Sequence, residues 1–245
     1  MKHILNWVKK DFISRLNSKK SKFKGVRVAF TLAEVLITLG IIGVVAALTM
    51  PTLIQNHQKQ VYVTGLKKAY SNIQNMFSKM AFDEGVTDWS NLYCYQSSSS
   101  LIGCSGDAQT FERECSKHLE KQFNIVEKKL YGENCSSDWC KTASKLAYIN
   151  STSEHQQSLF LTPDSMIYLF NCVSRIITVD VNGTKGPNQW GRDIFAFHVR
   201  YDENKILPSG ISGSSVYCTT EAVNNASYNA RYCAGKVIRE GKMDY

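Results

Sequence analysis

The sequence predicts an α+β protein in which a long N-terminal helix, membrane-spanning in its first half, packs on a C-terminal antiparallel sheet with disulfide bonds. Three observations lead to this fold class. Residues 35–54 carry no charge, and residues 55–82 repeat apolar side chains at helical spacing. Residues 165–207 instead alternate β-branched and aromatic runs with turn residues, which is typical of short strands.

The first 29 residues form a basic leader. Nine lysines and arginines stand there against one acid, so the leader carries the whole net charge of +8, and 20 basic and 20 acidic residues remain. Because the rest of the chain is neutral, its charge gives no support to nucleic-acid binding. Basic residues before an apolar run indicate a cytoplasmic N-terminus and a single pass through the membrane.

Residues 30–54 are the segment expected to cross the membrane. Twenty uncharged residues, at about 1.5 Å rise each, span roughly the 30 Å of a hydrocarbon core. Glu34 is the one charged residue in the segment, and an acid inside a membrane indicates a function and needs a partner. The threonines can return their hydroxyls to the helix backbone, and two glycines leave room for another helix to approach.

Residues 29–51, AFTLAEVLITLGIIGVVAALTMP, resemble the N-terminal segment of type IV pilins and type II secretion pseudopilins. The resemblance implies cleavage by a prepilin peptidase between Ala29 and Phe30, N-methylation of Phe30, and a helix kink at Pro51. It also implies that Glu34 pairs with the methylated amine of Phe30 in a neighbouring subunit. The family usually has Gly before the cut, where this chain has Ala29.

The resemblance implies a pilin-like fold and the role of a minor pilin or pseudopilin in a type IV pilus or type II secretion filament. Expected partners are other subunits, the prepilin peptidase and an assembly platform in the bacterial inner membrane. The C-terminal domain would be periplasmic, and the assembled filament periplasmic or on the cell surface. The alternative is a membrane-anchored periplasmic binding or sensor module that keeps residues 1–29. A DNA-uptake fibre has no support from the neutral remainder.

Residues 55–82 are expected to continue the helix as a stalk that ends at Asp83-Glu84-Gly85. Its apolar positions recur at three- and four-residue steps and predict one buried face. They are Val61 or Tyr62, then Leu66, Ala69, Tyr70, Ile73, Met76, Phe77 and Met80. Residues 83–245 are expected to form one globular domain.

All eight cysteines lie after residue 93, which places that part of the chain in an oxidising compartment. Eight cysteines allow 105 connectivities. The expected local pairs are Cys94–Cys104, Cys135–Cys140 and Cys218–Cys233, which leaves Cys115–Cys172. Zinc binding is the alternative, and the absence of a CxxC motif and of paired histidines weakens it. In type IV pilins a C-terminal disulfide often bounds a surface loop, and Cys218 with Cys233 resembles that arrangement.

Strands are expected at residues 166–173, 176–181 and 194–201, with a short strand at 205–207. The links between them are short, which predicts antiparallel hairpins. A last edge strand is expected within residues 236–245, and a second helix over residues 110–130.

Four oxygen-bearing side chains surround a glycine-containing turn between two of these strands. They belong to Asp180, Asn182, Asn188 and Asp193, and such a set can hold Ca²⁺. The position of Gly183 and the lack of a glutamate at the twelfth position differ from an EF-hand loop. We favour an Asx- and Gly-stabilised hairpin turn, with calcium as the alternative and no other cofactor expected.

Catalysis is not expected of this chain. No serine stands in a GxSxG motif, no glycine-rich phosphate loop follows a strand, and the histidines are scattered.

Overall fold

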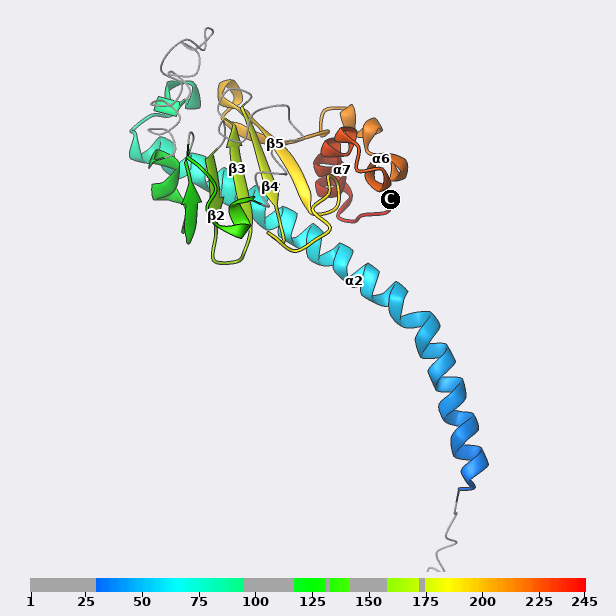
Figure 1. Cartoon of the computed structure of the whole chain (residues 1–245). Helices are drawn as coiled ribbons and strands as arrows, with labels where there is room; N and C mark the ends of the chain where they lie inside the picture. Colours follow the sequence, from blue (N-terminus) through cyan, green and yellow to red (C-terminus); the bar gives the residue numbers. More distant parts are fainter. Residues whose placement is uncertain (1–29, 95–116, 131–132, 142–157, 172–174) are drawn as a thin grey trace, which may run out of the picture. The chain divides into compact units, whose positions relative to one another are not determined.

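The computed structural model describes residues 30–94, 117–130, 133–141, 158–171 and 175–245 of the 245-residue chain. The chain divides into two compact units, residues 1–51 and residues 52–245. Helix α2 (Leu32–Asp83) begins in the first unit and ends in the second (Figure 1). All the described strands belong to the second unit, so the layout is α+β, as predicted.

Helix α2 contains the predicted apolar segment from Leu32 onward and the whole of the predicted stalk. It includes Pro51, and the kink expected there remains a prediction. Asp83 is its last residue, and Gly85 follows with a φ of +68°, a left-handed conformation that glycine adopts without steric cost. The Val86 amide donates to the Ala81 carbonyl at 2.9 Å and satisfies one of the last helical acceptors.

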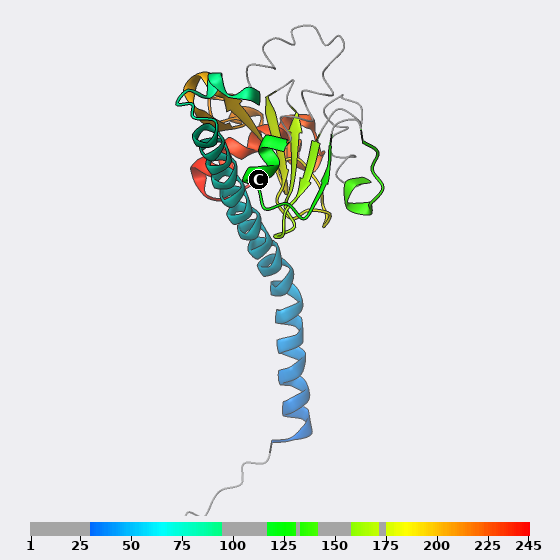
Figure 2. The same ribbon diagram turned by 90° about the vertical axis from the view of Figure 1, so that its left-hand side faces the viewer.

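The second half of α2 runs along the sheet (Figure 2). Its predicted apolar stripe is buried in the core that it shares with the strands. Tyr62, and not Val61, begins this stripe, since Tyr62 is buried and Val61 is exposed. Tyr70 is half-buried and stacks on Phe197 of the sheet, with ring centroids 5.9 Å apart. The fully buried positions are Leu66, Ala69, Ile73, Met76, Phe77 and Met80. The helical period therefore predicted the packed face correctly.

The sheet has six antiparallel strands whose spatial order follows the sequence. The strands are β1 (Glu127–Lys129), β2 (Ser158–Leu161), β3 (Ile167–Asn171), β4 (Ile176–Asp180), β5 (Ile194–Arg200) and β6 (Lys205–Pro208). The last four agree with the predicted strands and hairpins, and the first two were not predicted. In the register of β4, Asp180 pairs with Ile167 on one side and Ile194 on the other.

Side chains of successive strand residues alternate between the two faces of the sheet. Phe160, Tyr168, Phe170, Phe195 and Phe197 join the core beneath α2. On the other face Leu159, Ile167 and Leu169 pack with Cys140, while Ile194 and Ala196 pack with Trp190 and Cys233. The sheet is buried on both faces, which accounts for the near-continuous apolar runs of its strands.

Short helices follow the sheet and lie beside β5 and β6 (Figure 1). They are η4 (Ser214–Tyr217), α6 (Thr220–Asn224), η5 (Tyr228–Tyr232) and α7 (Cys233–Glu240). The edge strand predicted within residues 236–245 was therefore wrong. Ala234 and Val237 of α7 are both buried, at a three-residue step that suits a helix, and Gly241 ends the helix with a φ of +71°.

The helix predicted over residues 110–130 was wrong in its second part. Residues 117–122 are helical, but residues 127–129 form strand β1, which pairs with β2 from Glu127–Leu161 to Lys129–Leu159. Pairing with β2 supplies backbone hydrogen bonds that override the apolar spacing. Residues 110–116 of the predicted helix lie outside the described residues.

Candidate functional site

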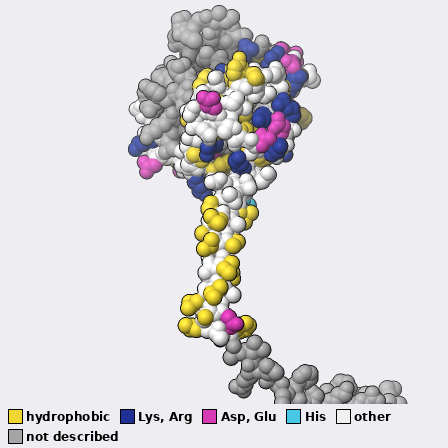
Figure 3. Space-filling model, turned by 90° about the vertical axis from the view of Figure 1, so that its right-hand side faces the viewer, with side chains coloured by type: hydrophobic (Ala, Val, Ile, Leu, Met, Phe, Trp, Pro, Cys, Tyr) yellow, Lys and Arg dark blue, Asp and Glu magenta, His cyan; other side chains and the backbone are white. Residues whose placement is uncertain are grey.

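The first half of α2 is apolar and exposed within its own unit. Among the described residues, α2 is the one helix long and apolar enough to cross a membrane. Its large apolar side chains between Phe30 and Ile54 are 44% to 81% exposed, and they dominate the surface of this helix (Figure 3). Space around Gly40 and Gly43 is open. A surface of this kind needs lipid or other helices to cover it.

The start of α2 is closed by a reciprocal cap between Thr31 and Glu34. The Glu34 amide donates to Thr31 Oγ1 at 3.2 Å, and Glu34 Oε2 accepts from the Thr31 amide at 2.8 Å. The Thr31 hydroxyl also donates to Glu34 Oε2 at 2.8 Å. This is a capping box, which satisfies two of the helix's free amides. Glu34 therefore has a partner within its own chain, although that partner is not a cation.

Thr38 and Thr49 of the apolar segment hydrogen-bond to the helix backbone as predicted. The Thr38 hydroxyl donates to the Val35 carbonyl and the Thr49 hydroxyl to the Val45 carbonyl, each at 3.0 Å. These bonds satisfy the two hydroxyl groups, which would destabilise the helix in lipid if they had no hydrogen-bond partner.

A second candidate site lies in the loop between β4 and β5, where two acids are fully buried. Asp193 accepts from the backbone amides of Asn188 and Gln189 at 2.8 and 2.7 Å, one on each carboxylate oxygen. Asp180 Oδ1 accepts from the Asn182 amide at 3.1 Å. Gly183 makes the turn possible: its φ is +68°, and an added Cβ would lie 2.2 Å from the Ser165 carbonyl oxygen.

Burial, together with the charge of nearby Asp193, raises the pKa of Asp180 to about 8. Burial also raises the pKa of Asp193, and its bonds to the amides of Gln189 and Asn188 oppose that rise. Within the part of the chain that the structure describes, no lysine or arginine forms an ion pair with either carboxylate. Two neighbouring acids without a cation are an unfavourable arrangement at neutral pH.

The amide of Asn188 turns one end toward three oxygen atoms. That end lies 3.2 Å from Asp180 Oδ2, 3.1 Å from the Gly183 carbonyl and 3.0 Å from the Lys185 carbonyl. If the end is the nitrogen, its two hydrogens serve three acceptors. All three groups are acceptors, so the nitrogen assignment satisfies the hydrogen bonds without an ion, and only the opposite assignment would need a cation.

These oxygens suit Ca²⁺ better than a transition metal. The groups gathered around Asn188 are carbonyl, amide and carboxylate oxygens, which calcium prefers. The described residues contain no group of three or more His, Cys, Asp or Glu placed to hold a metal ion. Asn182 Oδ1 is buried, and it has no hydrogen-bond partner among the described residues. Donors now about 3 Å apart around Asn188 would need only a small rearrangement to ligate Ca²⁺ at 2.3–2.6 Å.

The structure gives the four predicted calcium residues different positions. Asp180 and Asn188 meet, and the carbonyls of Gly183 and Lys185 join them. Asp193 uses both oxygens to hold the loop backbone, and Asn182 donates to the Gly186 carbonyl at 3.2 Å. Sequence inspection missed the two carbonyls because every residue has one. It also missed the capping box, although the T-x-x-E spacing of residues 31–34 was visible.

Two of the predicted disulfides are present. Cys135 bonds to Cys140, and Cys218 bonds to Cys233. Cys94 is disulfide-bonded as well, but Cys104, Cys115 and Cys172 lie outside the described residues, so the other pairings remain predictions.

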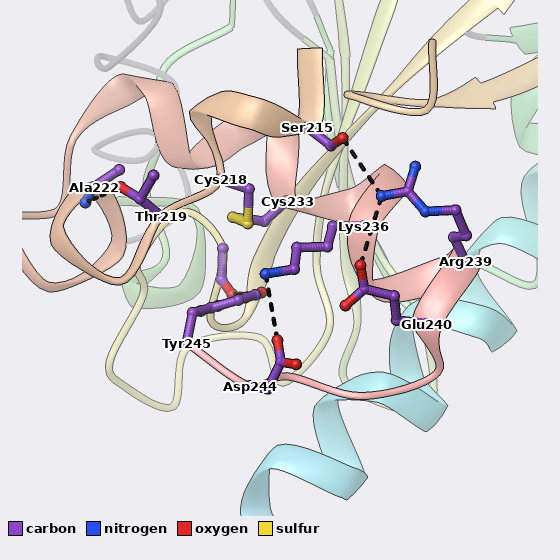
Figure 4. The surroundings of a disulfide bond; sticks show 11 residues. Ser215, Cys218, Thr219, Ala222, Cys233, Lys236, Arg239, Glu240, Asp244 and Tyr245 are labelled. Carbon is purple, nitrogen blue, oxygen red and sulfur yellow. Dashed lines mark hydrogen bonds and ion pairs between the residues drawn. A yellow bond between two sulfur atoms is a disulfide. The ribbon is translucent and has the colours of Figure 1, made fainter. Parts of the chain in front are cut away.

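The Cys218–Cys233 bond lies in the core beside α6 and α7 (Figure 4). The Thr219 hydroxyl caps α6 by accepting from the Ala222 amide at 3.1 Å. Lys236 Nζ lies 3.3 Å from Asp244 Oδ1, and the chain continues from there to Tyr245 (Figure 4). The disulfide thus fixes the segment that leads to the C-terminal residues.

The predicted processing residues are only partly described. Phe30 is 77% exposed directly before the capping box, whereas Ala29 lies outside the described residues. Comparison of this chain with protein-family models, with curated proteins and with solved structures finds no match. The resemblance of residues 29–51 to pilins therefore depends on the sequence alone.

Proposed function

We propose that this chain is a structural subunit of a type IV-like filament, either a minor pilin or a pseudopilin of type II secretion. A prepilin peptidase would cut it between Ala29 and Phe30 and methylate the new amine. The observation that carries the proposal is Glu34, the one charge in an apolar segment whose large apolar side chains are exposed.

Two features support an assembly role for the first half of α2. Its exposed apolar surface is free to pack on other helices once it leaves the membrane. Gly40 and Gly43 would let such helices approach closely, because nothing occupies the space where their side chains would stand. In the helix bundle, Glu34 would attract the Phe30 amine of a neighbour, and the low-dielectric surroundings would strengthen that attraction.

The N-terminal mass of the protein, purified from membranes of its native host, tests the processing step. A chain that begins at N-methylated Phe30 is the expected result. An intact residue 1–29 segment would contradict the proposal and favour a tethered periplasmic binding or sensor module.

Glu34 variants separate the two roles of this residue. Glu34→Gln keeps a capping box, since Gln serves at this position as well as Glu, but it removes the charge. Glu34→Ala removes both. If Glu34 pairs with an amine, both variants should lose filament yield about tenfold or more, which corresponds to roughly 1.4 kcal/mol for each subunit contact. Yield in a sheared-filament fraction measures this, with Thr38→Val as a control inside the same segment. Wild-type yield from Glu34→Gln would leave only the capping role.

We also infer that the β4–β5 loop binds Ca²⁺ through Asp180, Asn188 and the carbonyls of Gly183 and Lys185. The buried Asn182 Oδ1, which has no hydrogen-bond partner in the part of the chain that the structure describes, and the buried acid pair support this inference. In the proposed filament subunit, the ion would hold the β4–β5 loop of the C-terminal domain in place and would not take part in a reaction.

Calorimetric titration of the full chain in detergent tests the calcium site. Wild type should bind Ca²⁺ with a dissociation constant of about 10⁻³ M or tighter. Asp180→Asn and Asn188→Ala should abolish the heat, while Asp138→Asn, which changes an exposed acid elsewhere, should not. Absence of heat from wild type at millimolar Ca²⁺ would leave the loop as a hydrogen-bonded turn.

A further inference from the structure

A polar groove of about 360 Å³ lies within the second unit, between α2 and two further segments. These are residues 122–124, just before β1, and residues 162–164, between β2 and β3. Among the described residues its lining contains four carboxamide side chains, two lysines and one acid, and only three apolar residues. Small-molecule pockets are usually lined by apolar side chains. This polar groove instead suits a ligand that is rich in hydrogen-bonding groups.

One wall of the polar groove is a polar stripe of α2. Four lining residues of this helix follow one another at steps of four, three and four residues, which places them on one face. They are Lys68, Asn72, Asn75 and Lys79. From the first to the last, this stripe extends about 16 Å along the helix. Such a wall can contact several units of a linear molecule.

The carboxamides of the polar groove keep donors and acceptors available. Asn75 and Asn124 are exposed, and neither side chain forms a hydrogen bond within the part of the chain that the structure describes. Asn72 Nδ2 donates to the Tyr168 hydroxyl at 3.2 Å, which leaves the Asn72 side-chain oxygen and a second N–H. A carboxamide offers donors and an acceptor side by side, and a hydroxyl group is both, so these side chains match neighbouring hydroxyl groups.

An aromatic ring in the polar groove is held in place from behind. The Phe123 ring is half-buried, and its centroid lies 4.7 Å from that of Tyr168 and 6.2 Å from that of Phe170. Tyr168 therefore positions both the ring of Phe123 and the carboxamide of Asn72. A sugar ring has an apolar face of C–H groups, which can pack on the apolar face of an aromatic ring.

The charges of the polar groove largely cancel. Lys68 Nζ lies 2.7 Å from Asp164 Oδ2, and the Thr162 hydroxyl donates to the other carboxylate oxygen. Burial raises the pKa of Asp164, but the hydrogen bonds from Lys68 and Thr162 outweigh burial and lower it, so this acid is charged at neutral pH. Lys79 then carries the one unpaired charge among the described lining residues. A nucleic acid needs many cations on its phosphates, so an uncharged ligand fits better.

We propose that the polar groove binds a linear oligosaccharide, with the carboxamides of Asn72, Asn75 and Asn124 as contacts for its hydroxyl groups. The Phe123 ring packs against the face of one sugar unit. The described lining holds one acid, already engaged by a lysine and a threonine, whereas glycoside hydrolysis uses two carboxyl groups. The inference is therefore of binding and not of cleavage. It goes beyond the proposed function and needs neither N-terminal processing nor filament assembly.

Calorimetric titration of the full chain with two tetrasaccharides, cellotetraose and the N-acetylglucosamine tetramer, tests the inference. The protein is kept in a zwitterionic detergent, because a detergent with a sugar headgroup would compete for the polar groove. Wild type should bind at least one of the two sugars saturably. Asn75→Ala and Asn124→Ala should each weaken that binding about five- to tenfold, the effect of losing one hydrogen bond or two.

Asn56→Ala is the matched control, because it removes an exposed carboxamide from α2 outside the polar groove and should leave binding unchanged. Phe123→Leu keeps an apolar side chain but removes the flat ring, so it should weaken binding about fivefold. The two asparagine variants change exposed side chains and should fold as wild type does, which keeps the comparison valid if Phe123→Leu is unstable.

Absence of saturable binding of both sugars at millimolar concentration would overturn the proposal. Wild-type affinity in both Asn75→Ala and Asn124→Ala would overturn it too, because the sugar would then bind elsewhere on the protein. Failure of N-terminal processing leaves these titrations unchanged, so this proposal and the filament proposal fail separately.

Discussion

Asp180 and Asp193 are two acids whose side chains are buried at the facing ends of β4 and β5. Burial raises the pKa of Asp180 from its ordinary value of 3.8 to about 8 in the folded protein. At pH values between these two, the folded protein therefore keeps a proton on Asp180 that the unfolded chain has released. Without a cation, Asp180 stabilises the fold at low pH, and this stabilisation is lost as the pH rises toward 8.

We therefore predict that the free energy of unfolding falls between pH 5 and about 8 in EDTA, by roughly 1.4 kcal/mol for each unit of pKa difference that is titrated. Millimolar Ca²⁺ should remove this fall, since the ion favours the charged carboxylates. Asp180→Asn should flatten the profile in EDTA and make it insensitive to Ca²⁺. Urea unfolding at a series of pH values measures the effect.

Asp138→Asn, at an exposed site on another segment, is the control and should keep the wild-type profile. A wild-type stability that rises with pH in EDTA would show that the buried acids do not govern the pH dependence. Asp193 contributes to the pH dependence of stability with the same sign as Asp180, because burial raises the pKa of Asp193 too. The variant that combines Asp180→Asn with Asp193→Asn should thus flatten the pH profile of stability at least as much as Asp180→Asn alone.

Single residues were predictable only where the side chain itself carries the chemistry. Asp180 and Asn188 could be selected from the sequence because carboxylate and amide oxygens are calcium ligands. The carbonyls of Gly183 and Lys185 could not, since the fold alone turns them toward Asn188. Glu34 was selected for its charge in an apolar segment, and its local hydrogen bonds to Thr31 were overlooked for that reason.

At the scale of elements, the Cys218–Cys233 disulfide joins the start of α6 to the start of α7 across 15 residues. In the chain-entropy description, a loop of that length stabilises the fold by about 3 kcal/mol, and a loop of five residues by about 2 kcal/mol. The disulfide is also packed in the core with Trp190 and Val223.

We predict that Cys218→Ser with Cys233→Ser lowers the free energy of unfolding by about 3 kcal/mol or more, measured by denaturant unfolding. Cys135→Ser with Cys140→Ser is the control pair, and it should cost about 2 kcal/mol because its loop spans only five residues. A larger loss from the control pair than from the Cys218–Cys233 pair would contradict this ranking.

Elements with a long, regular pattern were predicted well, and short ones were not. Helix α2 repeats its apolar residues over many turns, so its buried face was predicted correctly, with the first position left open between Val61 and Tyr62. Strand β1 has three residues and depends on β2 for its hydrogen bonds, so no local pattern could identify it. Helix α7 was missed because the expected segment began at Lys236, after its first buried residues, Cys233 and Ala234.

At the scale of the whole molecule, the uneven distribution of charge along the chain was predictable from the sequence, but the long-range contacts were not. The +8 charge of the first 29 residues can be counted directly from the sequence. The cavity of about 330 Å³ beside the β4–β5 loop cannot be found in this way, because it brings residues 55–62 beside residues 187–192 and 243–245. Contacts over such separations depend on the complete fold, and the Lys59–Tyr245 hydrogen bond, across 186 residues, is an example.

Each described strand of the sheet after β1 pairs with the strand just before it in the sequence. A sheet with this order needs no late insertion of a central strand, so it can form hairpin by hairpin in chain order. The last 15-residue loop closes only when Cys233 arrives. Oxidation of Cys218 and Cys233 to the disulfide would then be the last step, and it would stabilise a domain whose sheet is already complete.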